Sequence, residues 1–185
     1  LPHVVAPILF LLVSYAYFSP LIEGKRIVQH DITMYKGSAK EILDFKNETG
    51  KETLWTNSMF GGMPAYLVST SFNGNLLRFV NEILEIGQQP ASFIFVTFLG
   101  FYILLLVLGV NPWLSIVGSF AYGFSSYFLI VIGAGHNAKI HAISYVAPML
   151  AGMILTFKGK FFSGFSLFSL FFGLNLLTGH PQITY

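Results

Sequence analysis

The sequence predicts an all-α polytopic membrane protein, and three features support this prediction. Of the 185 residues, 54% are hydrophobic and only 10% are charged, whereas soluble proteins carry roughly 25% charged residues. Every acidic residue and seven of the ten basic ones lie between Glu23 and Glu85. From residue 86 onward only Lys139, Lys158 and Lys160 are charged. This stretch is too apolar for a surface in water, so it must face lipid or other apolar helices.

Five apolar runs are each close to the roughly 17–25 residues that cross a bilayer core. They cover residues 4–22, 91–110, 113–132, 140–157 and 161–177. In the first run Pro7 falls in the first turn, where a missing N–H is tolerated. A cleavable signal peptide is the alternative for this run, but it lacks a basic leader and a small-residue cleavage site. Glycine, proline and lysine turns separate the later runs, so we expect about five spans with antiparallel neighbours.

The one long connection, residues 23–90, is expected to contain helices. Ser38-Ala39-Lys40-Glu41 predicts a capping box at the start of a helix that ends near Gly50. Asn75 is the expected cap of a second, amphipathic helix that stops before Gly87. This helix either lies in the membrane interface or packs onto the protein, and both alternatives stay open. Between the two helices, Gly61-Gly62 and Met63-Pro64 indicate an ordered turn within residues 55–66, suited to contacting a substrate.

The antiparallel order brings most of the polar chemistry to one side of the membrane. The end of the first span, the long loop, the turn between spans three and four and the tail after span five share this side. Its candidate residues are His30, Asp31, His136, Asn137, Lys139, His141, His180 and Gln182. Polar residues also gather at helix ends merely because they avoid the bilayer centre, but their one-sidedness favours a functional site. The positive-inside rule assigns Lys158 and Lys160 to the cytoplasm and the candidate site to the outside.

Asp31 is the candidate general base, because a carboxylate can take a proton from a hydroxyl within about 3 Å. A solvated loop acid is the alternative. If residues 29–32 are extended, His30 and Asp31 point to opposite faces. His136 and His141 are five residues apart, about 140° on a helix, so they do not form an i, i+4 metal pair. A divalent metal held by Asp31 and distant histidines is an alternative that we do not expect.

Several function classes are excluded by the sequence. The net charge is only +2 and no basic cluster alternates with aromatic residues, which argues against nucleic-acid binding. The absence of cysteine excludes thiolate metal sites. No Gly-x-Ser-x-Gly, His-Glu-x-x-His or phosphate-binding glycine loop is present. A cation channel would need acidic rings along its spans, and the apolar runs contain none.

Four segments in order resemble the bacterial YfhO-type membrane proteins: Gln29-His30-Asp31, the segment 55–66, the segment 135–142 and the segment 179–185. Members of that family are longer, so we expect this chain to be a single transmembrane-domain fragment. The family is similar to the C-type glycosyltransferases, in which the first outer loop carries an essential acidic residue. Asp31 matches that position. Many such enzymes have two neighbouring acids, whereas the nearest ones here are Glu41 and Asp44.

The resemblance implies a glycosyltransferase of the bacterial cytoplasmic membrane with its active face outside. It would move a sugar from a polyprenyl-phosphate carrier to an envelope polymer, lipid or protein, without a cofactor. Asp31 would deprotonate the acceptor hydroxyl while the lipid phosphate leaves from the opposite face of the sugar. The expected substrate-binding residues are His30, His136, Asn137, Lys139, His180 and Gln182. The alternative is a non-enzymatic carrier-lipid or polymer transporter, or an assembly subunit. Neither internal repeats nor broken helices are evident in the sequence, but Pro148 and Gly152 in the fourth span keep this alternative open.

Overall fold

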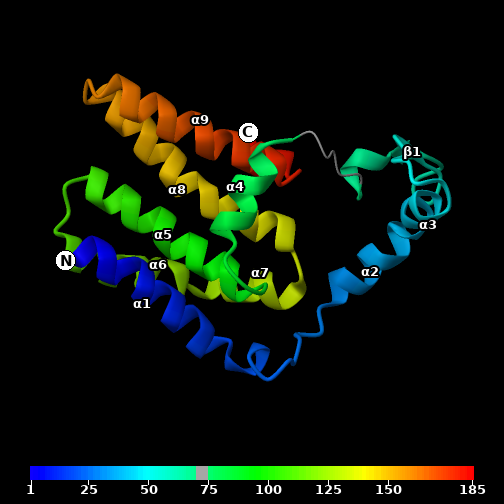
Figure 1. The fold of residues 1–185 in the computed structure, drawn as a ribbon, viewed down its shortest axis with the longest axis horizontal. Coiled ribbons are helices and arrows are strands. Elements are labelled where there is room, and N and C mark those ends of the chain that lie inside the picture. The colour runs from blue at the N-terminus through cyan, green and yellow to red at the C-terminus, as the bar shows by residue number, and fades with distance from the viewer. Residues whose placement is uncertain (70–74) are drawn as a thin grey trace. The chain divides into compact units, whose positions relative to one another are not determined.

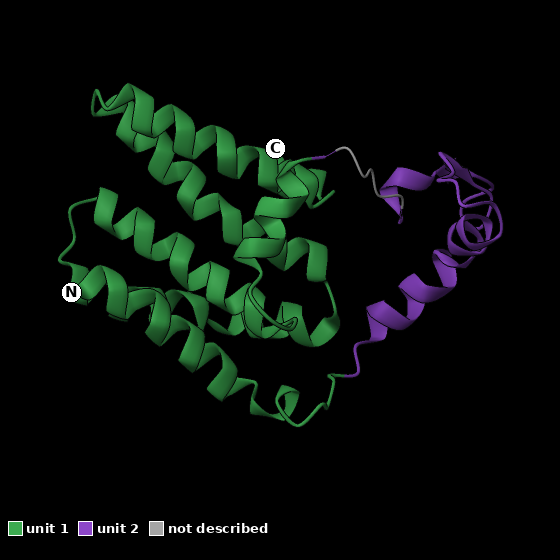
Figure 2. Cartoon of the chain, in the orientation of Figure 1, with its two compact units in different colours: residues 1–27, 76–185 green, residues 28–75 purple. Residues whose placement is uncertain are grey.

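The structure is a computed structural model that describes residues 1–69 and 75–185, and these residues are predominantly helical (Figure 1). The chain divides into two compact units. Residues 1–27 and 76–185 form what we call the helical unit, and residues 28–75 form the loop unit (Figure 2). The all-α prediction is confirmed, since the only described strands are a pair of two residues each.

The helical unit is built around one central helix, α5. Its longer helices are α1 (Pro2–Tyr17), α5 (Ala91–Val107), α6 (Pro112–Gly123), α7 (Ser126–Ala134), α8 (Asn137–Phe157) and α9 (Phe161–Leu177). Shorter elements are η1 (Ser19–Leu21), α4 (Leu77–Leu84) and α10 (Pro181–Thr184). Helix α5 packs against α1, α6 and α8, and most of its side chains are buried. Helices α8 and α9 also pack extensively against each other.

Aromatic rings form much of the core between α1, α5 and α6. Phe10 is fully buried, and its ring centroid lies 5.5 Å from that of Phe98 and 5.3 Å from that of Phe120. The Phe10–Phe120 pair is edge-to-face, which is a favoured geometry for aromatic rings. At the contact between α8 and α9, glycines take the place of large side chains. A Cβ on Gly152 would lie 2.5 Å from the backbone N of Phe168 and 2.9 Å from the carbonyl O of Gly164, so only glycine permits this backbone approach.

The predicted count of five spans is not confirmed. Among the described residues, helix α8 alone has the length and hydropathy to cross a membrane. Helices α6 and α7 pass the same test together, but they are bent by 45°. The predicted spans 4–22 and 91–110 end early, at Tyr17 and Val107, because a 3₁₀ turn containing Pro20 and a turn through Gly109 (φ +88°) interrupt them. Helices α1 and α5 are therefore only 16 and 17 residues long, and α9, which has its predicted bounds, is 17 residues long; these lengths are near the lower limit of about 17 residues for crossing.

The outward side of the helical unit is rich in large apolar side chains. They lie on α1, α6, α8 and α9, and include Val4, Ile8, Leu12, Trp113, Leu114, Val117, Leu150, Met153, Phe157, Phe161, Phe162 and Phe165. Phe162 is 86% exposed and Phe157 is 88% exposed. Extended apolar surface of this kind is unusual on a protein surrounded by water and is typical of a lipid or protein contact.

The loop unit contains α2 (His30–Ser38), α3 (Lys40–Thr49), the strands β1 (Trp55–Thr56) and β2 (Met63–Pro64), and η2 (Ala65–Leu67). The condition that residues 29–32 are extended is not met, because residues 30–32 are helical. Gln29 is extended and caps α2, which begins at His30. His30 and Asp31 are therefore successive helical residues about 100° apart, rather than on opposite faces of a strand.

The predicted helix that ends at Gly50 is present, but its capping box is not. Ser38 is still part of α2, and its Oγ donates to the Met34 carbonyl at 3.1 Å. The Glu41 carboxylate instead accepts from Thr56 Oγ1 at 2.7 Å and from the Asn57 N–H at 2.9 Å. The bond from Thr56 is the main cause of a lowered pKa at Glu41. Glu41 therefore holds the β1–β2 hairpin against α3 instead of closing the helix end.

Helix α4 begins at Leu77 with Leu76 as its N-cap, so the prediction that Asn75 caps it was one residue off. Three of its apolar side chains, those of Leu77, Val80 and Leu84, pack against the core cluster of the helical unit. Of the two alternatives left open for this helix, the structure therefore shows packing onto the protein. Because α4 belongs to the helical unit, the predicted outer loop 23–90 is divided: residues 76–90 fold with the bundle.

The close α8–α9 contact predicts that Gly152→Ala destabilises the helical unit by about 1–3 kcal/mol, the usual cost of overpacking. The matched control is Gly133→Ala in α7, where an added Cβ meets nothing within 4 Å and helix propensity alone favours alanine by up to about 1 kcal/mol. Thermal unfolding of both variants in detergent measures the difference. Equal midpoints for the two variants would contradict the close approach.

Candidate functional site

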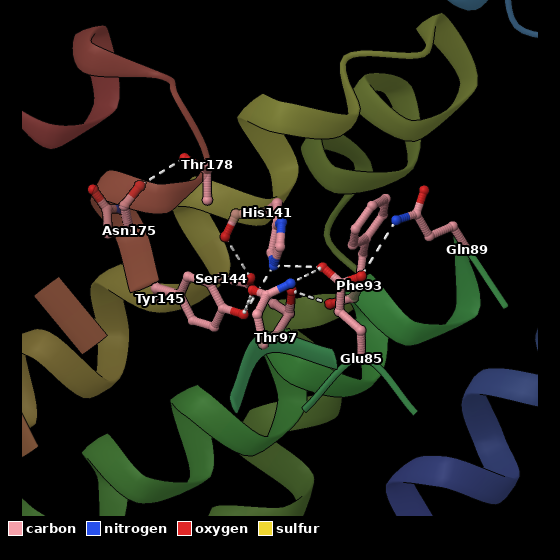
Figure 3. A network of polar contacts seen from close by, with 10 residues as sticks. Glu85, Gln89, Phe93, Thr97, His141, Ser144, Tyr145, Asn175 and Thr178 are labelled. Atoms are coloured by element: carbon pink, nitrogen blue, oxygen red, sulfur yellow. Dashed lines mark hydrogen bonds and ion pairs between the residues drawn. The ribbon is translucent and has the colours of Figure 1, made fainter. Parts of the chain in front are cut away.

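Four polar side chains meet where α4 crosses the first turns of α8. Asn81 lies on α4 and Glu85, four residues later, is the residue at its C-cap, while His141 and Tyr145 are one turn apart on α8. Residues four apart share a helix face, so each helix presents one pair to the other. Figure 3 shows the Glu85 carboxylate directed at the His141 ring, with the Tyr145 hydroxyl beside it. We call these four residues the α4–α8 ring.

The bonds of the α4–α8 ring form a closed circuit. The Tyr145 hydroxyl donates to Asn81 Oδ1 at 2.7 Å, and Asn81 Nδ2 donates to Glu85 Oε1 at 3.1 Å. His141 Nε2 lies 2.7 Å from the same carboxylate oxygen and 2.8 Å from the Tyr145 hydroxyl oxygen. Because the Tyr145 proton is directed at Asn81, its oxygen acts as the acceptor toward His141. The Nε2–H is then shared between two acceptors, as in other three-centre hydrogen bonds.

The α4–α8 ring is largely removed from solvent. The side chains of His141 and Glu85 are 12% and 16% exposed, and Tyr145 is fully buried. Gln89 Nε2 donates to Glu85 Oε2 at 3.3 Å, and the Phe93 ring lies 5.4 Å from the His141 ring. Burial raises the pKa of Glu85, but the bonds from His141, Asn81 and Gln89 outweigh burial, so the net pKa is lowered.

A second polar tie connects α9, α8 and α10 close to the ring. Asn175 is fully buried; its Nδ2 donates to the Ala142 carbonyl at 2.8 Å, and its Oδ1 accepts from Thr184 Oγ1 at 2.8 Å. This tie holds the short helix α10 against the bundle and fixes the turn that contains His180. The Nδ1 atom of His180 is buried and has no hydrogen-bond partner among the residues that the structure describes.

The predicted substrate-binding residues of the helical unit lie near these two ties. His136 caps α8, and Asn137 and Lys139 are in its first turn. His180 caps α10, which also contains Gln182 and packs against α8. The Lys139 ammonium lies 5.5 Å from the centre of the Tyr127 ring, close enough for a cation–π contact. His30 and Asp31 belong to the loop unit, where they begin α2; Asp31 is half-buried and His30 is exposed.

Sequence reasoning missed most of the α4–α8 ring. His141 was expected on the same side of the membrane as the other candidate residues but was given no role, and neither Asn81 nor Glu85 was a candidate site residue. The detectable signal was the pair of i, i+4 spacings, Asn81/Glu85 and His141/Tyr145, on two apolar helices. Within residues 1–69 and 75–185, no three His, Asp or Glu side chains are grouped so that they could hold a metal ion.

Comparisons with known proteins gave no relatives. No protein-family model, curated protein or solved structure matches this chain.

The α4–α8 ring predicts that Glu85→Gln destabilises the helical unit by about 1–3 kcal/mol at neutral pH, because a buried charge-assisted bond loses its charge. The pKa of Glu85 in the folded chain lies below its ordinary value of 4.5. The contribution of the ionised Glu85 carboxylate to the free energy of unfolding is therefore complete above about pH 4.5 and is lost as the pH falls through the pKa of the folded state. Unfolding midpoints measured from pH 7 down to pH 3 should converge for wild type and Glu85→Gln at the acid end.

The matched control is Glu82→Gln on the same helix, where the carboxylate is 55% exposed and pairs with Arg78 at 2.8 Å. An exposed pair of this kind contributes at most about 1 kcal/mol, so this variant should remain close to wild type at every pH. Equal losses for Glu82→Gln and Glu85→Gln would show that the ring adds nothing beyond surface charge.

Proposed function

We propose that the chain is an integral membrane protein whose helical unit lies in a bacterial cytoplasmic membrane. The observation that carries this proposal is the outward apolar surface of α1, α6, α8 and α9, including Phe157 and Phe162. Transferring such side chains from water to hydrocarbon gains about 25 cal/mol per Å². Helices of 16 or 17 residues fit a membrane if the bilayer thins locally or flanking residues reach the interface. We keep the proposed orientation, with Lys158 and Lys160 in the cytoplasm.

Glycosyl transfer from a polyprenyl-phosphate sugar is the activity that we propose, on the outer face. Asp31 would act as the general base toward the acceptor hydroxyl. Its support is the resemblance of the Gln-His-Asp segment to an acid-bearing outer loop, together with its place at the start of α2, shortly after α1. An envelope polymer, lipid or protein would supply the hydroxyl, and no cofactor would be needed.

Lys139, His136 and His180 are the proposed groups for the leaving phosphate. Each lies at the start of α8 or α10, in the same part of the helical unit. A fixed cation stabilises a departing phosphate more in the transition state than in the ground state, which is where rate is gained. His30, Asn137 and Gln182 would supply further hydrogen bonds to the sugar or the phosphate.

One observation favours the second candidate, a non-enzymatic transporter of a carrier lipid or polymer. Helices α6 and α7 are separated by a 45° bend at Phe124 and Ser125. Broken helices are a recurring feature of transporters, where the freed backbone groups contact the cargo. Activity separates the two candidates, because a transporter moves its cargo without forming a glycosidic bond.

Membrane topology provides the first test. The chain has no cysteine, so single cysteines at Asn47, Asn137 and Gly159 can be labelled in intact cells with a membrane-impermeant maleimide. We expect labelling at Asn47 and Asn137 and none at Gly159 until the cells are opened. Labelling at Gly159 alone would show that the orientation is the reverse of the proposed one. Release of the chain from membranes by an alkaline wash would contradict the proposal that it is embedded in the membrane.

Asp31→Asn tests the proposed base. It keeps the shape of the side chain and removes the ionisable group, so glycosyl transfer should fall by about 10²–10⁴-fold, as is typical when a general base is lost. The rate is measured with the full-length protein and a polyprenyl-phosphate sugar, with expression and unfolding midpoint as checks on folding. Asp44→Asn, on α3 of the same unit, is the matched control. Loss at Asp44 with an active Asp31→Asn would move the base to α3.

A further inference from the structure

The β1–β2 hairpin presents an exposed phenylalanine in an unfavourable backbone conformation. Strand pairing sets Trp55 opposite Pro64 and Thr56 opposite Met63, and the loop 57–62 joins them. At its tip Phe60 has φ +52°, the only described non-glycine residue with positive φ, and its side chain is 89% exposed. A glycine would adopt this conformation without steric cost, whereas a residue with a side chain is strained in it.

The hairpin is held firmly at its base. Thr56 is fully buried and donates to Glu41, whose carboxylate also accepts from the Asn57 N–H. Within the loop, the Gly62 N–H donates to the Met59 carbonyl at 2.8 Å. The Trp55 indole covers Gly62 so closely that an added Cβ would lie 2.9 Å from it. These contacts position the tip, but none of them uses the Phe60 side chain.

Charge is distributed unevenly within the loop unit. All nine of its charged residues lie between Asp31 and Glu52, on α2, α3 and the turn that follows, and the sequence from Thr53 to Leu77 contains none. Leu54, Trp55, Tyr66 and Leu67 are each more than half exposed beside this uncharged hairpin. The unit therefore has a charged helical part and an uncharged part that ends in an apolar tip.

We propose that the hairpin tip, residues 59–61, inserts into the hydrocarbon edge of the lipid bilayer and anchors the loop unit at the membrane surface. This rests on the proposed membrane embedding, since both ends of the loop unit continue into the helical unit. Burying Phe60 in hydrocarbon supplies the apolar contact that the protein itself does not give it. Trp55, half-exposed behind the tip, matches the preference of tryptophan for the membrane–water interface.

A lipid fits this tip better than a sugar does. A sugar-binding surface combines a ring with hydrogen-bonding groups directed at hydroxyls, whereas the Ser58 hydroxyl here donates to the Ser38 carbonyl at 2.9 Å and the Asn57 N–H is bound to Glu41. Phenylalanine also has no polar atom of its own. Contact with a soluble sugar is the competing occupant, and it gives a different result in the test below.

Spin labelling of the full chain in phosphatidylcholine vesicles tests the insertion. A nitroxide is attached at Met59→Cys, beside an intact Phe60, and its collisions with oxygen and with a water-soluble nickel chelate are compared. Oxygen concentrates in hydrocarbon and the chelate stays in water, so we expect the label at 59 to favour oxygen. A label at Asn47→Cys, exposed on α3, is the control and should favour nickel.

Adding Phe60→Gly to the Met59→Cys chain should shift the label toward nickel while the unfolding midpoint stays equal or rises, because glycine relieves the positive φ. A label at 59 that favours nickel with Phe60 in place overturns the insertion, as does one shielded from both reagents or protected only when sugar is added. If an alkaline wash releases the chain from the vesicles, the proposed embedding fails; if the chain stays and the label is in water, only the tip insertion fails.

Discussion

The helical unit depends on satisfying one buried charge. Glu85 follows α4 directly and is the last charged residue before Lys139, and an ionised carboxylate removed from water is costly unless it is paired and hydrogen-bonded. His141, Asn81 and Gln89 supply that compensation. Because Asn81 is itself held by Tyr145, the compensation requires α4 to lie across α8 in one register.

Several buried hydroxyls of the helical unit are satisfied locally, whereas the Ser92 hydroxyl is buried without a hydrogen-bond partner among the described residues. Ser14, Thr97 and Ser119 each donate to the carbonyl of the residue four positions earlier, at 2.7–2.8 Å. Such bonds need no partner on another helix, so they place no constraint on packing. Asn175 is the exception, because its amide joins α9 to both α8 and α10. Specific helix registry thus comes from a few long-range polar ties within an otherwise apolar and aromatic core.

The sequence predicted the helical class well, since hydrophobic runs and glycine or proline turns are local signals. It predicted the end of α3 at Gly50 for the same reason. The prediction from sequence failed where a residue has competing partners. Serine is a residue type favoured at helix N-caps, but α2 continues through Ser38, and Glu41 binds the hairpin instead. The contact between the two halves of the α4–α8 ring could not be predicted, because they are about sixty residues apart; the two i, i+4 spacings are visible in the sequence, but no local signal shows that they pair with each other. The lengths of α1 and α5 were overestimated because apolar residues continue into the turns that follow them.

The geometry of the α4–α8 ring argues that it positions α4 and does not carry out catalysis. A general base must offer a free lone pair to an incoming hydroxyl and a pKa near the working pH. Glu85 Oε1 already accepts from His141 and Asn81, Oε2 accepts from Gln89, and the net pKa is lowered rather than raised. His141 Nε2 is likewise occupied by two acceptors. A base for the proposed reaction must therefore come from outside this ring, and so the proposal assigns that role to Asp31.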